Sequence, residues 1–322
     1  MHKKFLRALA VMLVMIASIT TVAAQDATPA ATPVGSTGLQ GAIDWLISQQ
    51  QEDGSWLGFS GEPDAGTTVD AIISLAAARE ADANVGDSID KAMAWLGTDD
   101  VALVYAQTGT GQAAKLTLAL AAVGSDSLEI AGVEPLALVQ QGQDAESGLY
   151  GTGLYDHAYA LMALAATDSD VPQNAIDFLS TVQAANGGFA WDGSTDETMV
   201  DSNTTSMIVQ ALVAVGQGDS DMVTNAVAYL QTTISDQGAA YAVGGDVDAN
   251  STALVAQALI AVDEDATVLI ATLSTFQNAN GAFFWQHADM TDNSFSTIQA
   301  IPAAAGVAFP VVPGVLELQE AA

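Results

Sequence analysis

A two-residue pattern recurs six times along the hydrophobic stretches of this chain. Each time, a small residue is followed by Leu or Ile near the end of an apolar run. The six pairs are Ser74-Leu75, Ala119-Leu120, Ala163-Leu164, Ala211-Leu212, Ala258-Leu259 and Ala300-Ile301. The second residues of these pairs are separated by 45, 44, 48, 47 and 42 residues. Spacing this regular predicts a repeat architecture in which every copy forms the same unit of secondary structure.

The third copy shows what that unit contains. Residues 173–186 have apolar positions at helical spacing, and Gly187 ends the pattern. A loop with two aromatic residues follows. Residues 201–216 then begin with the cap-type sequence Asp-Ser-Asn-Thr, continue with a second apolar stripe and end at a glycine. Each copy therefore predicts an outer helix, a glycine turn, an aromatic loop and an inner helix.

The second helix of each copy is the more apolar and contains little charge, which places it in the interior. An open solenoid needs a polar terminal repeat, yet the last copy stays apolar through residues 294–306. We therefore predict an all-α fold over residues 38–306. It is an α/α toroid of six helical hairpins, about twelve helices in total, with six parallel inner helices around a central cavity.

A second motif recurs in three of the predicted loops. It joins Gln, then Asp-Gly or Asn-Gly, then aromatic residues, as in the stretches 50–56, 183–191 and 277–285. We predict that Gln50, Gln183 and Gln277 satisfy backbone groups at the ends of outer helices. The glycines make the turns. The aromatics expected to fill the junction with the next hairpin are Trp56, Trp191 and Trp285, or Phe189 and Phe283 in place of the last two.

These stretches, written AIDWLISQQQEDGSW, VQAANGGFAW and FQNANGAFFW, resemble the repeat of terpenoid cyclases and protein prenyltransferases. The resemblance implies the toroid and a Gln and an aromatic that tie neighbouring hairpins together. The sixth copy, DNSFSTIQAIPAAAG, resembles the end of the toroidal domain of cobalamin carrier proteins. GLYDHAYALMALAA is similar to uncharacterised secreted bacterial members of the same fold.

The N-terminal residues predict export, and both ends of the chain predict extended segments. Residues 1–24 have a basic start, an apolar stretch and small residues before Gln25, as in a secretory signal peptide. Residues 25–37 are rich in Thr, Pro and Ala and predict a linker, and residues 307–322 predict an extended C-terminal tail. We expect a secreted monomer without stable membrane insertion once the signal is removed. An uncleaved anchor is the alternative.

The net charge and the absence of Cys exclude several classes of function. Removal of the signal leaves three basic residues against 38 acidic ones, hence a formal charge of −35. The chain therefore lacks the basic surface that nucleic-acid binding requires. It also contains no Cys. The resemblance implies that a prenyltransferase would need Asp, Cys and His on zinc, and basic residues for a diphosphate, so that activity is all but excluded.

Two kinds of enzyme stay open. The resemblance implies that a terpenoid cyclase would use an Asp-x-Asp-Asp acid motif, and residues 246–249 read Asp-Val-Asp-Ala. Asp246 and Asp248 match its first two acids, although a helix cap also explains Asp248. A glycan hydrolase would need two facing carboxylates, which the acids expected at the starts of the inner helices offer without selecting a pair.

Because the inner helices run parallel, their first residues and the aromatic loops should gather at one mouth. There we expect contacts with a small, neutral or cationic, partly planar ligand. The candidate residues are Tyr155, Asp156, His157, Tyr159, Trp191, Tyr241, Asp248, Trp285, His287 and Asp292.

The predicted function is non-catalytic binding of this small-molecule ligand. The resemblance to carrier proteins implies a corrinoid-like ligand. The alternatives are an enzyme, cyclase-like or glycan-active, and a structural or cell-surface interaction module. No cofactor is established by the residues, and calcium is considered because four oxygen-bearing residues lie close together in one loop: Asp192, Ser194, Asp196 and Glu197.

Overall fold

The computed structural model describes residues 37–314. The predicted signal peptide, all of the predicted linker except Thr37, and residues 315–322 of the predicted tail lie outside the described residues. Six helices form an inner set: α2 (Ala65–Glu80), α5 (Thr110–Ala122), α7 (Leu154–Ala166), α9 (Ser202–Ala214), α11 (Ala249–Ala261) and α13 (Ser294–Ala304).

The remaining helices form an outer set. They are α1 (Leu39–Ser48), α3 (Ser88–Leu96), α4 (Val101–Gln107), α6 (Pro135–Gln141), α8 (Gln173–Val182), α10 (Asp221–Gln231) and α12 (Thr267–Leu273), with the 3-10 helix η1 (Ser274–Phe276) after the last. Between α10 and α11 the chain makes a small antiparallel hairpin of β1 (Ile234–Ser235) and β2 (Gly238–Ala239), in which Ile234 pairs with Ala239.

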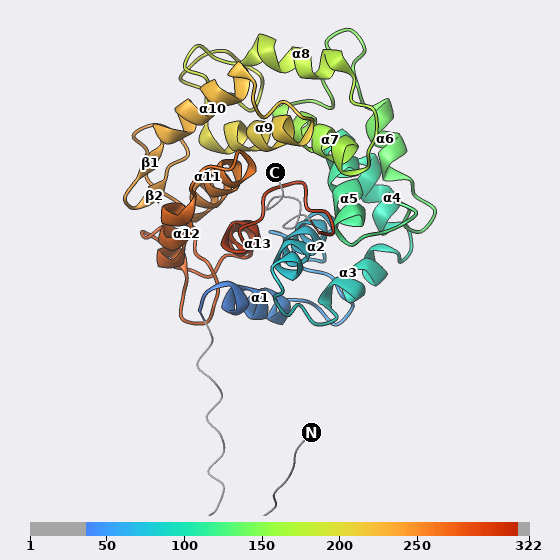
Figure 1. Ribbon diagram of the computed structural model, residues 1–322. Coiled ribbons are helices and arrows are strands. Elements are labelled where there is room, and N and C mark those ends of the chain that lie inside the picture. The colour runs from blue at the N-terminus through green and yellow to red at the C-terminus, as the bar shows by residue number, and fades with distance from the viewer. Residues whose placement is uncertain (1–36, 315–322) are drawn as a thin grey trace, which may run out of the picture. The chain divides into compact units, whose positions relative to one another are not determined.

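The inner helices close a ring. They pack side by side in the order α2, α5, α7, α9, α11 and α13, and α13 packs against α2 again. Figure 1 shows this inner ring with the outer helices around it. The predicted all-α toroid of six hairpins is confirmed. One detail differs: residues 37–314 contain thirteen α-helices, because the outer part of the second hairpin is split into α3 and α4 at Gly97 and the left-handed Asp99.

The repeated Leu column lies inside the ring. Leu75, Leu164 and their counterparts are buried, with at most 2% of each residue exposed. Each of the five leucines in the column follows the N-cap of its helix by eleven residues, as Leu75 follows Asp64. The sixth member, Ile301, follows its N-cap Asn293 by only eight. Three residues are close to one helical turn, so Ile301 still faces the same side. This offset explains the short last spacing of 42 residues.

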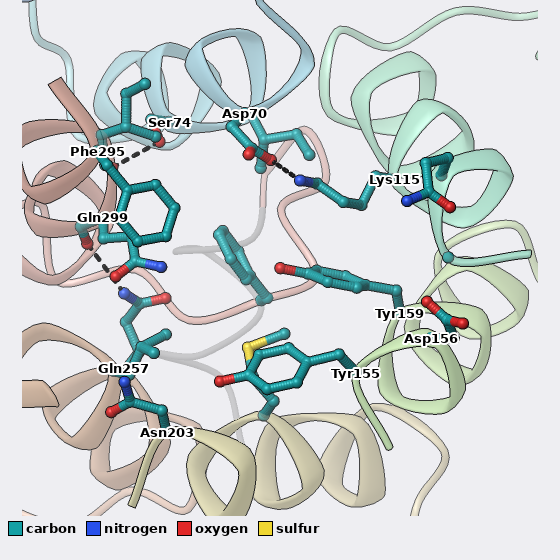
Figure 2. Close-up of a pocket in the computed structure, with 17 residues that line it drawn as sticks. Asp70, Ser74, Lys115, Tyr155, Asp156, Tyr159, Asn203, Gln257, Phe295 and Gln299 are labelled. Carbon is teal, nitrogen blue, oxygen red and sulfur yellow. Dashed lines mark hydrogen bonds and ion pairs between the residues drawn. The ribbon is translucent and has the colours of Figure 1, made fainter. Parts of the chain in front are cut away.

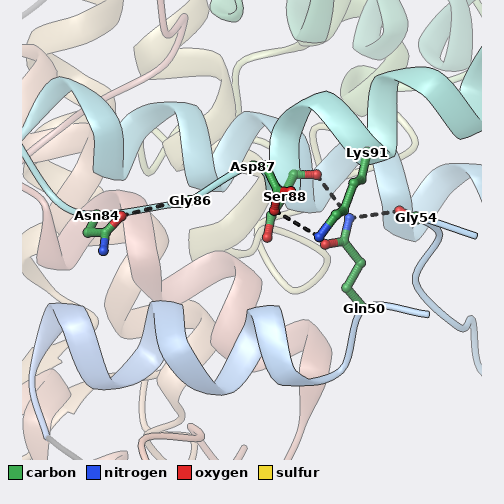
Figure 3. A network of polar contacts seen from close by, with 7 residues as sticks. All are labelled: Gln50, Gly54, Asn84, Gly86, Asp87, Ser88 and Lys91. Atoms are coloured by element: carbon green, nitrogen blue, oxygen red, sulfur yellow. Dashed lines mark hydrogen bonds and ion pairs between the residues drawn. The ribbon is translucent and has the colours of Figure 1, made fainter. Parts of the chain in front are cut away.

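At four of the six junctions, neighbouring hairpins share one kind of contact, which we call a ring joint. In each, a Gln side chain bonds its own glycine loop and the start of the next outer helix. Gln50 Nε2 donates to the carbonyl oxygens of Gly54 and Ser88, both at 2.9 Å (Figure 3). The other three Gln residues are Gln143, Gln183 and Gln277. Gln277 bonds Gly38 at the start of α1 and so joins the last hairpin to the first.

The glycines of the ring joints are required by both backbone angle and space. Gly54 and Gly281 have φ of 99° and 96°, a left-handed region that favours glycine. A Cβ on Gly54 would overlap the carbonyl oxygen of Lys91, and one on Gly281 would overlap that of Gly41. Gly148 and Gly187 meet the carbonyls of Asn174 and Asn225 in the same way. Close backbone approach therefore holds the ring together.

The first aromatic of each joint loop is buried. Trp56 is 1% exposed and Phe189 is fully buried, as the sequence predicts for this role. The backbone N–H of each donates to the fourth residue of the following inner helix, Thr68 Oγ1 at 3.0 Å and Thr205 Oγ1 at 2.9 Å. The expectation that Trp191 and Trp285 fill the junctions is wrong, because they are 54% and 50% exposed. Phe189 and Phe283, named as their alternatives, take that place.

The chain continues past α13 into the ring. Val307 and Val311 are buried, and the N–H of Phe309 donates to Gln210 Oε1 at 2.9 Å. The N–H of Gly314 donates to a carboxylate oxygen of Glu80 at 2.6 Å. In Figure 1 this segment crosses the middle of the ring. Within the part of the chain described, no helix is long and apolar enough to cross a membrane.

Candidate functional site

A cavity of about 390 Å³ lies within the inner ring. All six inner helices contribute to it, and the contributing positions repeat. The sixth residue of every inner helix lines the cavity: Asp70, Lys115, Tyr159, Met207, Leu254 and Gln299. Second residues such as Tyr155, Asn203 and Phe295 line it nearer the helix starts. Figure 2 shows these side chains converging from around the ring.

One wall of the cavity carries a charged pair. Lys115 Nζ lies 2.5 Å from Asp70 Oδ1, and the two side chains are 17% and 24% exposed. The ammonium also lies 5.6 Å from the centre of the Tyr159 ring, within cation–π range. Burial lowers the pKa of Lys115, but the adjacent Asp70 carboxylate and Tyr105 outweigh burial, and the net pKa is raised. Lys115 is therefore a fixed cation whose charge Asp70 offsets.

The facing wall carries amides. Gln257 Nε2 donates to the carbonyl oxygen of Gln299 at 3.2 Å, and Asn250 Nδ2 donates to Gln299 Oε1 at 2.6 Å. The carbonyl of Gln299 can only accept, so the Gln257 amide nitrogen must face it. Its other end, Gln257 Oε1, is buried and has no hydrogen-bond partner among the described residues. The rest of the lining is mainly apolar and aromatic: Ile73, Met207, Leu254, Phe295, Ile298 and Phe309, with the rings of Tyr155 and Tyr159.

A second hollow of about 280 Å³ shares Asn203 and Phe295 with the cavity. It contains Asp248, the N-cap of α11. Asp248 Oδ1 accepts from the Ser251 N–H at 2.8 Å, and Oδ2 accepts from the Ser251 hydroxyl at 2.7 Å. Burial raises the pKa of Asp248, and the hydrogen bonds from Ser251 offset only part of this effect. The carboxyl is thus both a helix cap and a weakened acid beside the mouth.

The structure divides the predicted site residues into groups. Tyr155, Asp156 and Tyr159 line the central cavity. Tyr241, Asp248 and Trp285 line the adjoining hollow. Asp292 lies in a third recess with Phe59 and Asp70, where its oxygens accept from the amides of Asn278 and Asn280, both at 2.7 Å.

The placement of His157 at the mouth is corrected. It is fully buried in a ring joint, where Nδ1 accepts from the Tyr150 N–H at 3.0 Å and Nε2 pairs with the Ala175 carbonyl at 3.1 Å. Burial lowers its pKa to about 4. His157 is the fourth residue of α7, the position at which α2 and α9 have Thr68 and Thr205. Like these threonines, His157 accepts a backbone N–H from the preceding loop, and it does not line the central cavity.

Two further candidates also lie away from the cavity. His287 stacks on Phe276 with ring centres 4.6 Å apart and lines a separate surface recess with Asp246. It belongs to the loop before α13 and does not line the central cavity. Trp191 is half exposed on its loop, and its backbone carbonyl accepts from the Leu154 N–H at 3.0 Å.

The loop considered for calcium is organised by its own turns. Asp192 accepts from the Ser194 N–H at 2.9 Å, and Asp196 accepts from the N–H and the hydroxyl of Thr198. Over residues 37–314, no group of three or more His, Cys, Asp or Glu side chains is arranged to hold a metal ion. Ser194 and Glu197 are not brought to a shared point by any contact that the structure shows.

Sequence reasoning did not name several cavity residues, among them Met207, Leu254, Gln257, Gln299, Phe295 and Phe309. A usable signal exists for three of them, Met207, Leu254 and Gln299. Counting six residues from each predicted N-cap finds the cavity position in every inner helix, because the helical period carries this position to the same face. No such count could find Phe309, which lies beyond the last helix.

Comparison with known proteins supports the fold. No family model and no curated protein sequence matches the chain. Among solved structures, it is similar to a type II terpene cyclase from Scytonema bound to its product merosterolic acid A. The TM-score is 0.60 with 14% identity, over 83% of this chain and 95% of that one.

The GH76A α-1,6-mannanase of Salegentibacter has a TM-score of 0.60 with 11% identity, over 83% of this chain and 98% of that one. A protein from Actinoplanes has a TM-score of 0.55 with 12% identity, over 83% and 97%. At such identities the likeness shows the fold alone. The chain therefore has the α/α toroid fold that the repeat predicts, and this fold is shared with the terpene cyclase and the mannanase.

The expectation of a non-catalytic binding protein is corrected by these matches. That expectation rested on a fold-level likeness to cobalamin carriers. The likeness found over nearly the full length of the other chains is instead to two enzymes, a cyclase and a mannanase. These neighbours correspond to the enzyme alternative rather than to a binding protein, and those named here include no cobalamin carrier.

Proposed function

We propose that this chain is an enzyme that performs acid–base chemistry on a mainly apolar substrate in its central cavity, as terpenoid cyclases do. The observation that carries the proposal is the cavity lining. Apolar and aromatic side chains from the inner helices surround a space of about 390 Å³. The charge of the Lys115 ammonium group in its wall is offset by Asp70. Such a surface suits a hydrocarbon body, and the faces of Tyr155 and Tyr159 suit a positive charge that develops on it.

Asp248 is the proposed proton donor. Its pKa is raised by burial, so it keeps its proton at a higher pH than an exposed Asp. It lies beside the mouth with Trp285 and Tyr241, in the hollow that shares Phe295 with the cavity. Its carboxyl proton would add to a carbon–carbon double bond, and loss of a proton from the resulting cation would complete an isomerisation or cyclisation. Asp246, the other match to the acid motif, lies in a separate recess.

The test is product formation from geranylgeraniol and from geranylgeranyl dihydroxybenzoate, measured by mass spectrometry. Asp248→Asn should abolish turnover and leave the melting temperature nearly unchanged, because Asn caps a helix as well as Asp does. The matched control is Asp201→Asn. Asp201 caps α9 in the same way and has a raised pKa, but it lies outside the cavity and the hollow. Equal turnover in wild type and Asp248→Asn would refute the assignment of the acid.

A second candidate is glycan hydrolysis. Asp70 and Asp156 place two carboxylates on the cavity lining, from α2 and α7. Hydrolases need such a pair across the sugar, and the neighbouring mannanase was captured with α-1,6-mannotriose. Glycan hydrolysis ranks second for two reasons. The cavity lining is mainly apolar, and Asp70 is already paired with Lys115. Release of mannose from α-1,6-mannotriose, lost in Asp156→Asn, would reverse this ranking.

Export and a monomeric state also remain proposals. The residue pattern of 1–24 supports the first. An N-terminus at Gln25 in protein recovered from culture medium would support the first. Sedimentation at the mass of one chain would support the second.

A further inference from the structure

The segment that follows α13 fills the end of the ring that lies away from the mouth. Val307 and Val311 are buried within it. Its N–H at Phe309 bonds Gln210, the ninth residue of α9, and its N–H at Gly314 bonds Glu80, the last residue of α2. The segment therefore reaches halfway along the inner helices and then returns to their C-terminal ends.

Among the described residues 305–314, Phe309 is the one that lines the cavity. The deepest helical residues on the lining are Gln257 and Ser74, the ninth and tenth residues of their helices. The cavity thus occupies the first ten residues of the inner helices, a depth of about 15 Å at the α-helical rise. Beyond that level the C-terminal segment occupies the ring.

We infer that Phe309 is the floor of the cavity and sets the length of substrate that the enzyme accepts. The inference rests on the proposed function for the apolar nature of the substrate. The benzyl side chain of Phe309 offers no hydrogen bond, so the end of the substrate that reaches it is apolar. The backbone of Phe309 is held by Gln210, which is itself fully buried, and this contact keeps the floor at one depth.

A series of straight-chain alkanols from octanol to octadecanol serves as a ruler for the cavity. Affinity is measured by titration calorimetry and by thermal shift for the wild type, Phe309→Ala and Val311→Ala. In the wild type, affinity should rise with chain length and then stop rising when the chain meets the floor. In Phe309→Ala the rise should continue, and every methylene that enters the new space should tighten binding about fourfold.

Val311→Ala is the matched control. Val311 belongs to the same segment and is 1% exposed, but it does not line the cavity. It should loosen the segment to a similar degree and keep the wild-type length limit. Phe309→Trp should shorten the limit. If Phe309→Ala does not fold, Phe309→Leu and Phe309→Trp still test the inference in opposite directions. An unchanged limit in these folded variants would overturn it.

A second measurement separates this inference from the proposed function. Crystals of Phe309→Ala under xenon pressure should show xenon beside Gln210, in space that the wild type fills. If no alkanol binds the wild type, the apolar substrate is wrong, but xenon still reports on the floor. Absence of that xenon site, with the segment collapsed into the space, would refute the role of Phe309 by itself.

Discussion

The ring joints and the central cavity use neighbouring positions of the same inner helices, yet they follow opposite rules. At the fourth position, α2, α9, α11 and α13 all have Thr, and α7 has His157; each accepts a buried backbone N–H from the preceding loop. At the sixth position, the six helices carry six different residues, from Asp70 to Gln299. The same kind of donor must be satisfied at the fourth position in each of these copies, whereas the sixth positions face the cavity and have no common partner.

The loop aromatics divide in the same way. Trp56 lies in a ring joint, and its indole N–H donates to the Leu46 carbonyl at 2.8 Å. Trp191 follows the joint residue Phe189 by two positions, and 54% of it is exposed to solvent. Two tryptophans of similar motifs therefore have different roles, and substitution should separate them.

Trp56→Ala should cause the largest loss, roughly 3–5 kcal/mol in the free energy of unfolding, because it empties a buried site and leaves the Leu46 carbonyl without its donor. Trp191→Ala should change that free energy by less than about 0.5 kcal/mol, as exposed substitutions do. Urea unfolding of the two variants measures both. Similar losses in the two would contradict the division between joint and rim.

Gly281→Ala should cost roughly 3 kcal/mol, because its Cβ would overlap the Gly41 carbonyl at the joint that closes the ring. Gly244→Ala is the control. Gly244 has a similar left-handed φ of 78° with nothing within 4 Å of a Cβ, so only the backbone penalty of about 1 kcal/mol applies. Thermal and urea unfolding of both variants should differ by the cost of the overlap. Equal losses would show that the ring does not depend on this contact.

His157→Thr tests whether His157 belongs to the joints. The folded pKa is about 4, below the ordinary value of 6.5, so between these pH values the unfolded chain binds a proton that the folded chain does not. The wild type should lose up to roughly 3 kcal/mol relative to the variant as the pH falls from 6.5 to 4. The raised pKa values of Asp201 and Asp248 act in both proteins and cancel in this difference. Parallel stability curves would place His157 in contact with solvent.

Lys115→Met addresses the cavity side of the comparison, and a loss of about 2 kcal/mol is expected, since Asp70 is left partly buried without its partner. The double variant Asp70→Leu with Lys115→Met should recover most of that loss, because no unpaired charge remains. A double-mutant cycle by urea unfolding gives the coupling. Additive losses would mean that the pair contributes nothing to stability, and that Lys115 is free to bind a substrate anion.

The fold could be predicted well from the sequence because its signals are local and repeated. The Leu column, the helix caps and the Gln and Gly residues of the joints each act within one hairpin or between neighbours. The candidate site was harder. Tyr155, Asp156 and Tyr159, which the sequence predicts at the mouth, line the cavity, but the same helix carries His157 into a joint. One residue along a helix turns a side chain by about 100°.

The sequence by itself determined the repeat, its two helices and the residues that must close one hairpin onto the next. These follow from helical period, capping and the backbone freedom of glycine. The tertiary structure alone decided which loop aromatic is buried, which six side chains meet at the centre and where the segment after α13 runs. Those outcomes depend on contacts between residues far apart in the chain, such as Phe309 with Gln210, which no local pattern encodes.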